Sequence, residues 1–117
     1  MLDRFTKKAQ QALSLAESTA EELGHHYIGT EHILVGLLQE GTGVAARLLE
    51  AYGVREDKVL ELIRRLIAPS NPVSLQEPNA YSPSAAAVLE NSYMEARRFK
   101  SQLVGTEHIL IAMLKRV

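Results

Sequence analysis

A six-residue segment, Gly-Thr-Glu-His-Ile-Leu, occurs twice in this chain, at residues 29–34 and 105–110, an offset of 76 residues. At the same offset and without a gap, residues 5–41 align with residues 81–117. A single short helical unit cannot bury its own apolar face, whereas two copies can bury theirs against each other. The repeat therefore predicts one domain that is built from two related helical units.

The apolar pattern within the first copy predicts four helices and no strands. Small and apolar residues recur there at alternating spacings of four and three, which is typical of one face of a helix: Ala9, Leu13, Ala16, Ala20 and Leu23. We expect Thr6 to cap this helix and Gly24 to end it. Thr30 is expected to be the N-cap of a second helix that ends at Gly41. Two more helices are expected after it, over 44–52 and 59–66.

The second copy is shorter than the first. It begins with Ser82-Pro83, an N-cap followed by proline at the first helical position. Counterparts of residues 43–67 would fall at 119–143, past Val117. We therefore expect an all-α fold with two pseudo-two-fold repeats of a four-helix unit, the second truncated after its second helix. We expect residues 1–117 to form a single domain. Within it, repeat one spans 4–67, the linker spans 68–81, and the incomplete repeat two spans 82–117.

Composition excludes several classes of function. Thirteen Lys and Arg against fourteen Asp and Glu give a net charge of −1, so the chain has no net positive charge that would attract phosphate backbones or anionic lipid. Nucleic acid and membrane are therefore not expected as partners. The chain has neither a run of ~20 apolar residues nor the apolar core of a signal peptide, and a cytoplasmic location is expected. The absence of cysteine excludes disulfides and thiolate catalysis, and no cofactor is expected.

Four histidines raise the question of metal or acid–base chemistry. Adjacent His25 and His26 point in different directions in a loop, and the chain has no His-Glu-x-x-His spacing, so a catalytic zinc is not expected. A small hydrolase that uses Glu31 and His32 as acid and base is an alternative, although a nucleophile elbow and a phosphate-binding glycine loop are missing. The simpler interpretation is that His32 and His108 are structural and form hydrogen bonds across the repeat interface.

Four segments together resemble the N-terminal domain of the ClpC-type AAA+ unfoldases: Arg-Phe-Thr at 4–6, Leu-Gly-His-His-Tyr-Ile-Gly-Thr-Glu-His-Ile-Leu at 23–34, Glu-Gly-Thr-Gly-Val-Ala-Ala at 40–46, and the second Gly-Thr-Glu-His-Ile-Leu at 105–110. The resemblance implies a non-catalytic module of a hexameric ATP-driven unfoldase, which receives substrate proteins and adaptor proteins for a partner protease. A stand-alone regulator that borrows the fold is the alternative.

The same resemblance implies two phosphoarginine pockets, one per repeat, which use Glu31 and Glu107 with the preceding Thr30 and Thr106. A carboxylate suits the guanidinium-derived N–H groups, and a helix N-terminus suits the phosphate. The first pocket is expected to bind better, because Arg4, Lys7 and Lys8 lie in or near the start of the first helix. The second copy has Ser84 and three alanines where the family has basic residues. The plainer interpretation of both Thr-Glu pairs is ordinary helix capping.

The truncation of the second copy predicts uncovered apolar surface. The first copy can pack its second helix against later helices that carry Leu48, Leu49, Leu62 and Ile63. The equivalent positions of the second copy, Ile109, Leu110, Met113 and Leu114, have no such helices after them. A symmetric partner chain, a swapped helix or the linker around 73–75 could cover them. A homodimer through the second repeat is the expected outcome.

Overall fold

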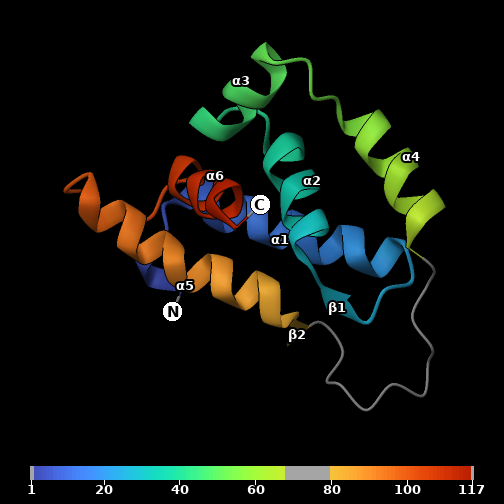
Figure 1. Ribbon diagram of the computed structural model, residues 1–117, viewed down its shortest axis with the longest axis horizontal. Helices are drawn as coiled ribbons and strands as arrows, with labels where there is room; N and C mark the ends of the chain where they lie inside the picture. The colour runs from blue at the N-terminus through green and yellow to red at the C-terminus, as the bar shows by residue number, and fades with distance from the viewer. Residues whose placement is uncertain (1, 68–79, 117) are drawn as a thin grey trace.

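The computed structural model describes residues 2–67 and 80–116. Within these ranges the chain forms helices and two very short strands, arranged as Figure 1 shows: η1 (Leu2–Arg4), α1 (Lys7–Glu22), β1 (Tyr27–Ile28), α2 (Thr30–Glu40), α3 (Val44–Ala51), α4 (Glu56–Leu66), β2 (Ala80–Tyr81), α5 (Pro83–Arg98) and α6 (Thr106–Lys115). The all-α fold class is confirmed. Most of the predicted linker, including residues 73–75, lies outside the described residues. No helix in the described ranges is both long and apolar enough to span a membrane.

The predicted starts and ends of several helices are confirmed. The Thr6 hydroxyl accepts a hydrogen bond from the Ala9 N–H at 3.1 Å, and the Ser82 hydroxyl accepts one from the Ala85 N–H at 3.1 Å. Gly24 ends α1 with φ of 75°. At the equivalent position after α5, Lys100 adopts φ of 58°. A non-glycine residue is rarely found there, because its Cβ crowds the backbone.

The predicted N-caps of α2 and α6 are wrong by one residue. Gly29 and Gly105 are the caps, and Thr30 and Thr106 are the first helical residues. The reason is a histidine three residues after each cap: Nδ1 of His32 accepts the Gly29 N–H at 2.8 Å. Nδ1 of His108 accepts the Gly105 N–H at 2.9 Å in the same way. These bonds lie within each repeat, so the expected histidine bonds across the repeat interface are also wrong.

Short parallel pairings, which the sequence analysis did not predict, join the two repeats crosswise. β1 pairs with β2, and an isolated bridge joins Phe5 to Val104. The Ser82 N–H donates to the Ile28 carbonyl at 2.9 Å, and the Thr6 N–H donates to the Val104 carbonyl at 2.9 Å. These two bonds are equivalent at the offset of 76, as a pseudo-two-fold axis requires. The start of α1 therefore lies beside the start of α6, and the start of α5 lies beside the start of α2.

The core forms where α1 crosses α2 and where α5 crosses α6. Its largest fully buried side chains come from both repeats and include Phe5, Ile28, Leu37, Leu89 and Ile109. α2 approaches α1 very closely at Gly36. A Cβ there would lie 2.1 Å from the Ala12 carbonyl oxygen. The equivalent residue of α6 is Ala112, so the crossing in the second repeat leaves room for a methyl group.

α3 packs against α6, because the Ala45 N–H at the start of α3 donates to the Thr106 hydroxyl at 3.2 Å. This contact corrects the expectation of uncovered side chains on α6. Ile109 and Leu110 are buried, with exposed fractions of 0% and 7%. Met113 is half-buried, and the expectation is confirmed for Leu114, which is 62% exposed.

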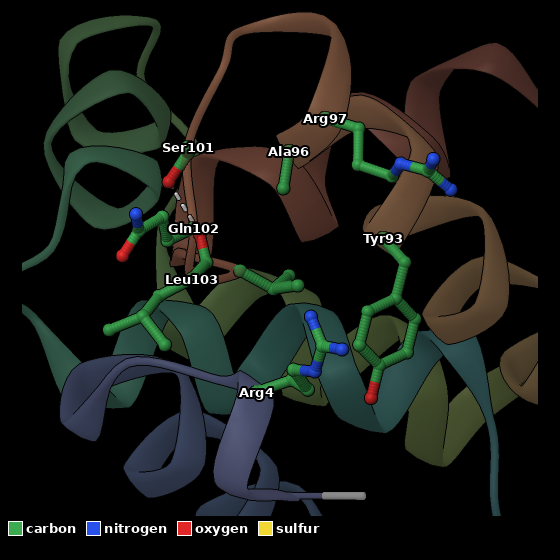
Figure 2. Close-up of a pocket in the computed structure, with 8 residues that line it drawn as sticks. Arg4, Tyr93, Ala96, Arg97, Ser101, Gln102 and Leu103 are labelled. Atoms are coloured by element: carbon green, nitrogen blue, oxygen red, sulfur yellow. Dashed lines mark hydrogen bonds between the residues drawn. The ribbon is translucent and has the colours of Figure 1, made fainter.

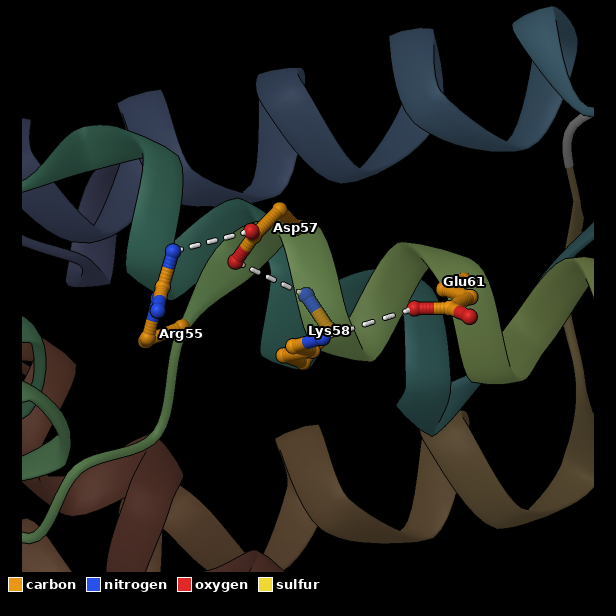
Figure 3. Close-up of polar contacts among 4 residues, drawn as sticks. All are labelled: Arg55, Asp57, Lys58 and Glu61. Atoms are coloured by element: carbon orange, nitrogen blue, oxygen red, sulfur yellow. Dashed lines mark hydrogen bonds and ion pairs between the residues drawn. The ribbon is translucent and has the colours of Figure 1, made fainter.

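α4 is held mainly at its start and at one buried side chain. The Gln39 amide of α2 donates to the Glu56 carboxylate at 3.1 Å, and Ile63 is buried. The expected burial of Leu48 and Leu62 is wrong, since these side chains are 45% and 51% exposed. Figure 3 shows ion pairs at this end of α4, with Arg55 bound to Asp57 at 3.0 Å. Both side chains are largely exposed, so the pair contributes little stability.

Candidate functional site

The second Thr-Glu motif borders a small cavity that draws its walls from both repeats. We call this cavity, of about 220 Å³, the Glu107 cavity, and its lining residues are Thr6, Lys8, Thr42, Gly43, Val44, Arg47, Gly105, Thr106 and Glu107. The start of α1 supplies Thr6 and Lys8 because of the bridge between Phe5 and Val104. The cavity therefore brings one carboxylate together with two cationic side chains.

The carboxylate of Glu107 lies close to its own helix cap. Gly105 has no side chain, and a Cβ there would lie 2.3 Å from Oε1 of Glu107. Glu31 lies over Gly29 in the same way, since a Cβ on Gly29 would lie 2.1 Å from Oε1 of Glu31. Both glutamates are half-buried. A glycine cap thus lets each carboxylate fold back toward the first turn of its helix, where the positive end of the helix dipole favours it.

The loop between α2 and α3 forms one wall of the Glu107 cavity and is fixed by Glu40. The Glu40 carboxylate accepts the N–H of Gly43 at 2.7 Å, the N–H of Thr42 at 3.2 Å and the Thr42 hydroxyl. Lys8 donates to the Thr42 carbonyl at 3.4 Å. Burial alone would raise the pKa of Glu40, but the bonds from Thr42 and Gly43, with the charge of Lys8, hold it below its ordinary value.

Thr106 belongs to the wall of this cavity. It is 3% exposed, and its hydroxyl accepts the N–H of Ala45. A Cβ on Gly43 would lie 2.6 Å from that hydroxyl oxygen, so the start of α3 approaches the start of α6 very closely. Arg47, one turn further along α3, reaches the cavity for this reason. Sequence reasoning missed Arg47, because nothing in the local pattern shows that α3 crosses the second repeat.

The first Thr-Glu motif has different surroundings. Thr30 lines an apolar groove of about 480 Å³, which we call the Thr30 groove, together with Leu34, Leu49, Val54, Ser84, Val88, Leu110, Met113, Leu114 and Arg116. Glu31 accepts a hydrogen bond from the Tyr27 hydroxyl at 3.2 Å. Burial, followed by the charge of Glu31 and this bond, raises the pKa of Tyr27. Leu103, which has no hydroxyl, stands at the equivalent position beside Glu107.

The prediction that basic residues lie near Glu31 is wrong for Arg4 and Lys8, which line other cavities. Arg4 lines a separate cavity together with residues of α5. Lys7 is exposed at the start of α1, and Lys8 lines the Glu107 cavity. The start of α5, which is rich in alanine, is the helix start that lies near Glu31. The crosswise pairing of the repeats is the physical reason, because each motif meets the first helix of the other repeat.

The histidines form a buried pair in the first repeat. His25 and His32 are 4% and 0% exposed, and Nδ1 of His25 lies 2.6 Å from Nε2 of His32. Because Nδ1 of His32 accepts the Gly29 N–H, neutral His32 carries its proton on Nε2 and donates it to His25. A buried and fully engaged imidazole has no path to a substrate. Among the described residues, no group of three or more His, Cys, Asp or Glu is arranged to hold a metal ion.

Comparison with known proteins identifies the family. The model of the Clp repeat (R) N-terminal domain matches residues 4–117. The chain is 44% identical over 115 residues to the negative regulator of genetic competence ClpC/MecB of Bacillus subtilis (strain 168), and 40% identical over 116 residues to the ATP-dependent Clp protease ATP-binding subunit ClpC of Staphylococcus aureus (strain USA300). Each match covers 98% of this chain and 14% of the relative. The chain belongs to the Clp repeat N-terminal domain family.

Solved structures of the family share the fold. The N-terminal domain of the chaperone ClpD from Arabidopsis thaliana superposes with a TM-score of 0.78 at 27% identity, over 96% of this chain and 76% of that one. The N-domain of ClpV from Vibrio cholerae superposes with a TM-score of 0.80 at 22% identity, over 98% of this chain and 69% of that one. A further structure with a TM-score of 0.80 and 21% identity, covering 98% of this chain and 70% of that one, is the complex of a ClpV N-domain with a VipB peptide.

Proposed function

We propose that this chain is the substrate- and adaptor-receiving N-domain of a ClpC-like ATP-dependent unfoldase, that it acts in the cytoplasm, and that it reads phosphoarginine at the Glu107 cavity. The ATPase and the protease that it would serve lie in other domains or chains. Identity to two ClpC proteins supports the unfoldase assignment. The complex of a ClpV N-domain with a VipB peptide supports peptide reception as a use of this fold.

The observation that carries the phosphoarginine proposal is the placement of Lys8 and Arg47 beside Glu107. Phosphoarginine joins a guanidinium-derived group to a dianionic phosphate. The Glu107 carboxylate can accept its N–H groups, while Lys8 and Arg47 can bind the phosphate with charge-assisted hydrogen bonds. The start of α6 adds the positive end of a helix dipole. The Thr30 groove is mainly apolar and has its one cation, among the lining residues described, at Arg116.

Calorimetric titration with free phosphoarginine tests this proposal. Removal of a charged hydrogen-bond partner typically costs about 1.5–3 kcal/mol, so Glu107→Ala should weaken binding by about tenfold or more. Arg47→Gln should weaken it because it removes a phosphate ligand. Glu31→Ala should have the smaller effect, and Glu61→Ala, an exposed glutamate of α4, is the matched control. Equal losses from Glu31→Ala and Glu107→Ala would contradict the preference for the Glu107 cavity.

We also propose that a second copy of the chain covers the Thr30 groove. Two features support a homodimer there: the 62% exposed side chain of Leu114 and the half-buried side chain of Met113. Both belong to the last helix of the second repeat and line the apolar groove. Contact with a second copy would remove this apolar surface from water, which is the usual driving force for association.

A further inference from the structure

A further cavity lies between the N-terminal segment and the end of α5, and neither Thr-Glu motif lines it. It has a volume of about 1030 Å³ and is lined by Arg4, Tyr93, Ala96, Arg97, Ser101, Gln102, Leu103 and Val104. We call it the Arg4–Arg97 cavity. Figure 2 shows that the Arg4 guanidinium lies between Leu103 and Tyr93, and that Arg97 lies at the rim of the cavity. None of its lining residues is shared with the Glu107 cavity.

The equivalent place in the first repeat is filled by side chains. Ser101 corresponds to His25 and Leu103 to Tyr27 at the offset of 76. His25 is 4% exposed, and the Tyr27 ring stacks on it with a centroid distance of 5.5 Å and an interplanar angle of 9°. In the second repeat the small Ser101 turns away and donates to the Leu103 carbonyl at 2.6 Å. The cavity therefore exists because two aromatic side chains are replaced by smaller ones.

The charge at the two places is opposite. Arg97 corresponds to Glu21, and Tyr93 corresponds to Glu17. Arg4 comes from η1 and adds a second guanidinium to the second repeat. Both arginines are exposed, and neither is within ion-pair distance of a carboxylate in the described part of the chain. Two exposed guanidinium groups at one cavity favour an anionic ligand, because arginine binds carboxylates in a bidentate geometry.

The floor of the cavity is apolar. Ala96 and Val104 are buried, at 3% and 2% exposure, and Leu103 at the edge is 45% exposed. A free inorganic anion would contact the arginines and leave this floor open to water. A ligand that covers both must carry acidic groups and an apolar group on one short scaffold.

We propose that the Arg4–Arg97 cavity binds an acidic peptide segment of a partner protein, with carboxylates on Arg4 and Arg97 and an apolar side chain on the floor formed by Ala96 and Val104. The segment binds by charge complementarity at the rim and by apolar burial below it. The inference does not rest on the phosphoarginine proposal, because the two cavities use different residues.

Fluorescence anisotropy with the full chain tests the proposal. The probe is a short fluorescein-labelled Gly-Ser peptide in which glutamates flank a single leucine, and the comparison peptide has lysines in place of the glutamates. The acidic peptide should bind at least about tenfold more tightly than the lysine peptide, since like charges at the rim repel the latter. The double variant Arg4→Gln/Arg97→Gln should weaken acidic-peptide binding by about tenfold or more. Both positions are exposed, so the fold is retained, which circular dichroism verifies.

Two further variants separate this site from general charge attraction. Arg64→Gln/Arg65→Gln removes the same charge from the exposed face of α4 and should change binding less than about twofold. Ser101→His introduces the residue of the first repeat, should fill the cavity and should weaken binding without a change in net charge at neutral pH. Failure of the acidic peptide to bind, equal binding of the lysine peptide, or equal losses in the two double variants would overturn the proposal. Self-association of the chain that Arg97→Gln abolishes would assign the cavity to a second copy and would also overturn it.

Discussion

The buried histidine pair of the first repeat makes stability depend on pH. The pKa of His32 lies below its ordinary value of 6.5, chiefly because burial disfavours the charged imidazolium; Glu31 opposes this effect and His25 adds to it. The unfolded chain therefore takes up a proton at a higher pH than the folded chain does. Stability from this source is complete at a pH well above 6.5, begins to be lost as the pH falls through about 6.5, and is lost further as the pH falls toward the pKa of the folded state.

We expect the free energy of unfolding to decrease between about pH 7.5 and about pH 5, because protonated His32 could no longer accept the Gly29 N–H. His32→Asn keeps an acceptor for that N–H and has no proton to gain. Its stability at neutral pH should be lower, because a buried ring is lost, but its dependence on pH should be weaker. Urea unfolding at several pH values measures both quantities.

His26→Asn is the matched control for this prediction, since His26 is half-buried and lies outside the pair. It should keep the pH dependence of the parent chain. If His32→Asn and the parent chain lost stability equally on acidification, the histidine pair would not be the source of the effect.

α1 and α2 cross in very close contact at Gly36. The Cβ of an alanine at Gly36 would lie 2.1 Å from the Ala12 carbonyl oxygen and 3.0 Å from the Ala16 backbone nitrogen. Both contacts are with backbone, which cannot turn aside as a flexible side chain can. Gly36 is therefore required by close packing, although glycine inside a helix is unfavourable by itself.

Gly36→Ala should lower the free energy of unfolding by about 1–3 kcal/mol, because overpacking outweighs the roughly 1 kcal/mol that alanine gains in helix propensity. Chemical denaturation followed by circular dichroism measures the change. The equivalent position in α6 provides the comparison: Ala112→Gly should cost about 1 kcal/mol from propensity alone, plus the loss of a buried methyl group. A Gly36→Ala variant as stable as the parent chain would show that α1 and α2 can separate without cost.

At the scale of the whole molecule, α3 of the first repeat covers much of the last helix of the second. The apolar surface left on α6 is smaller than the sequence suggested, since Ile109 and Leu110 are buried. Leu114 and the Thr30 groove remain as the surface for a second copy.

We expect concentration-dependent dimerisation in sedimentation velocity, and we expect Leu114→Glu to weaken it because a charge would have to be buried at the contact. The matched control is Leu66→Glu, which places the same charge on a 77% exposed leucine of α4. It should leave the dimer intact. A chain that remains monomeric at all concentrations would show that the groove needs no second copy.

Much of the fold was available from the sequence, because its signals are local. The offset of 76 identified the two repeats, Thr6 and Ser82 marked helix starts, and Gly24 marked a helix end. Each of these signals depends on neighbouring residues and on the period of the helix. Glu31 and Glu107 were identified from the sequence in the same way, because each follows a threonine at the start of a helix and the Thr-Glu pair occurs in both repeats.

The surroundings of those glutamates were decided only by tertiary structure. Phe5 pairs with Val104, which is far away in the chain, so Lys8 lines the cavity beside Glu107 and does not lie beside Glu31. The packing of α3 on α6 likewise brings Arg47 to the second motif. Pairings of two residues and crossings between helices leave no periodic pattern in the sequence. The apolar period shows which face of a helix is buried, but it does not show which other element packs against that face. The sequence by itself determined the helices and their duplication, and long-range pairing decided which residues share a site.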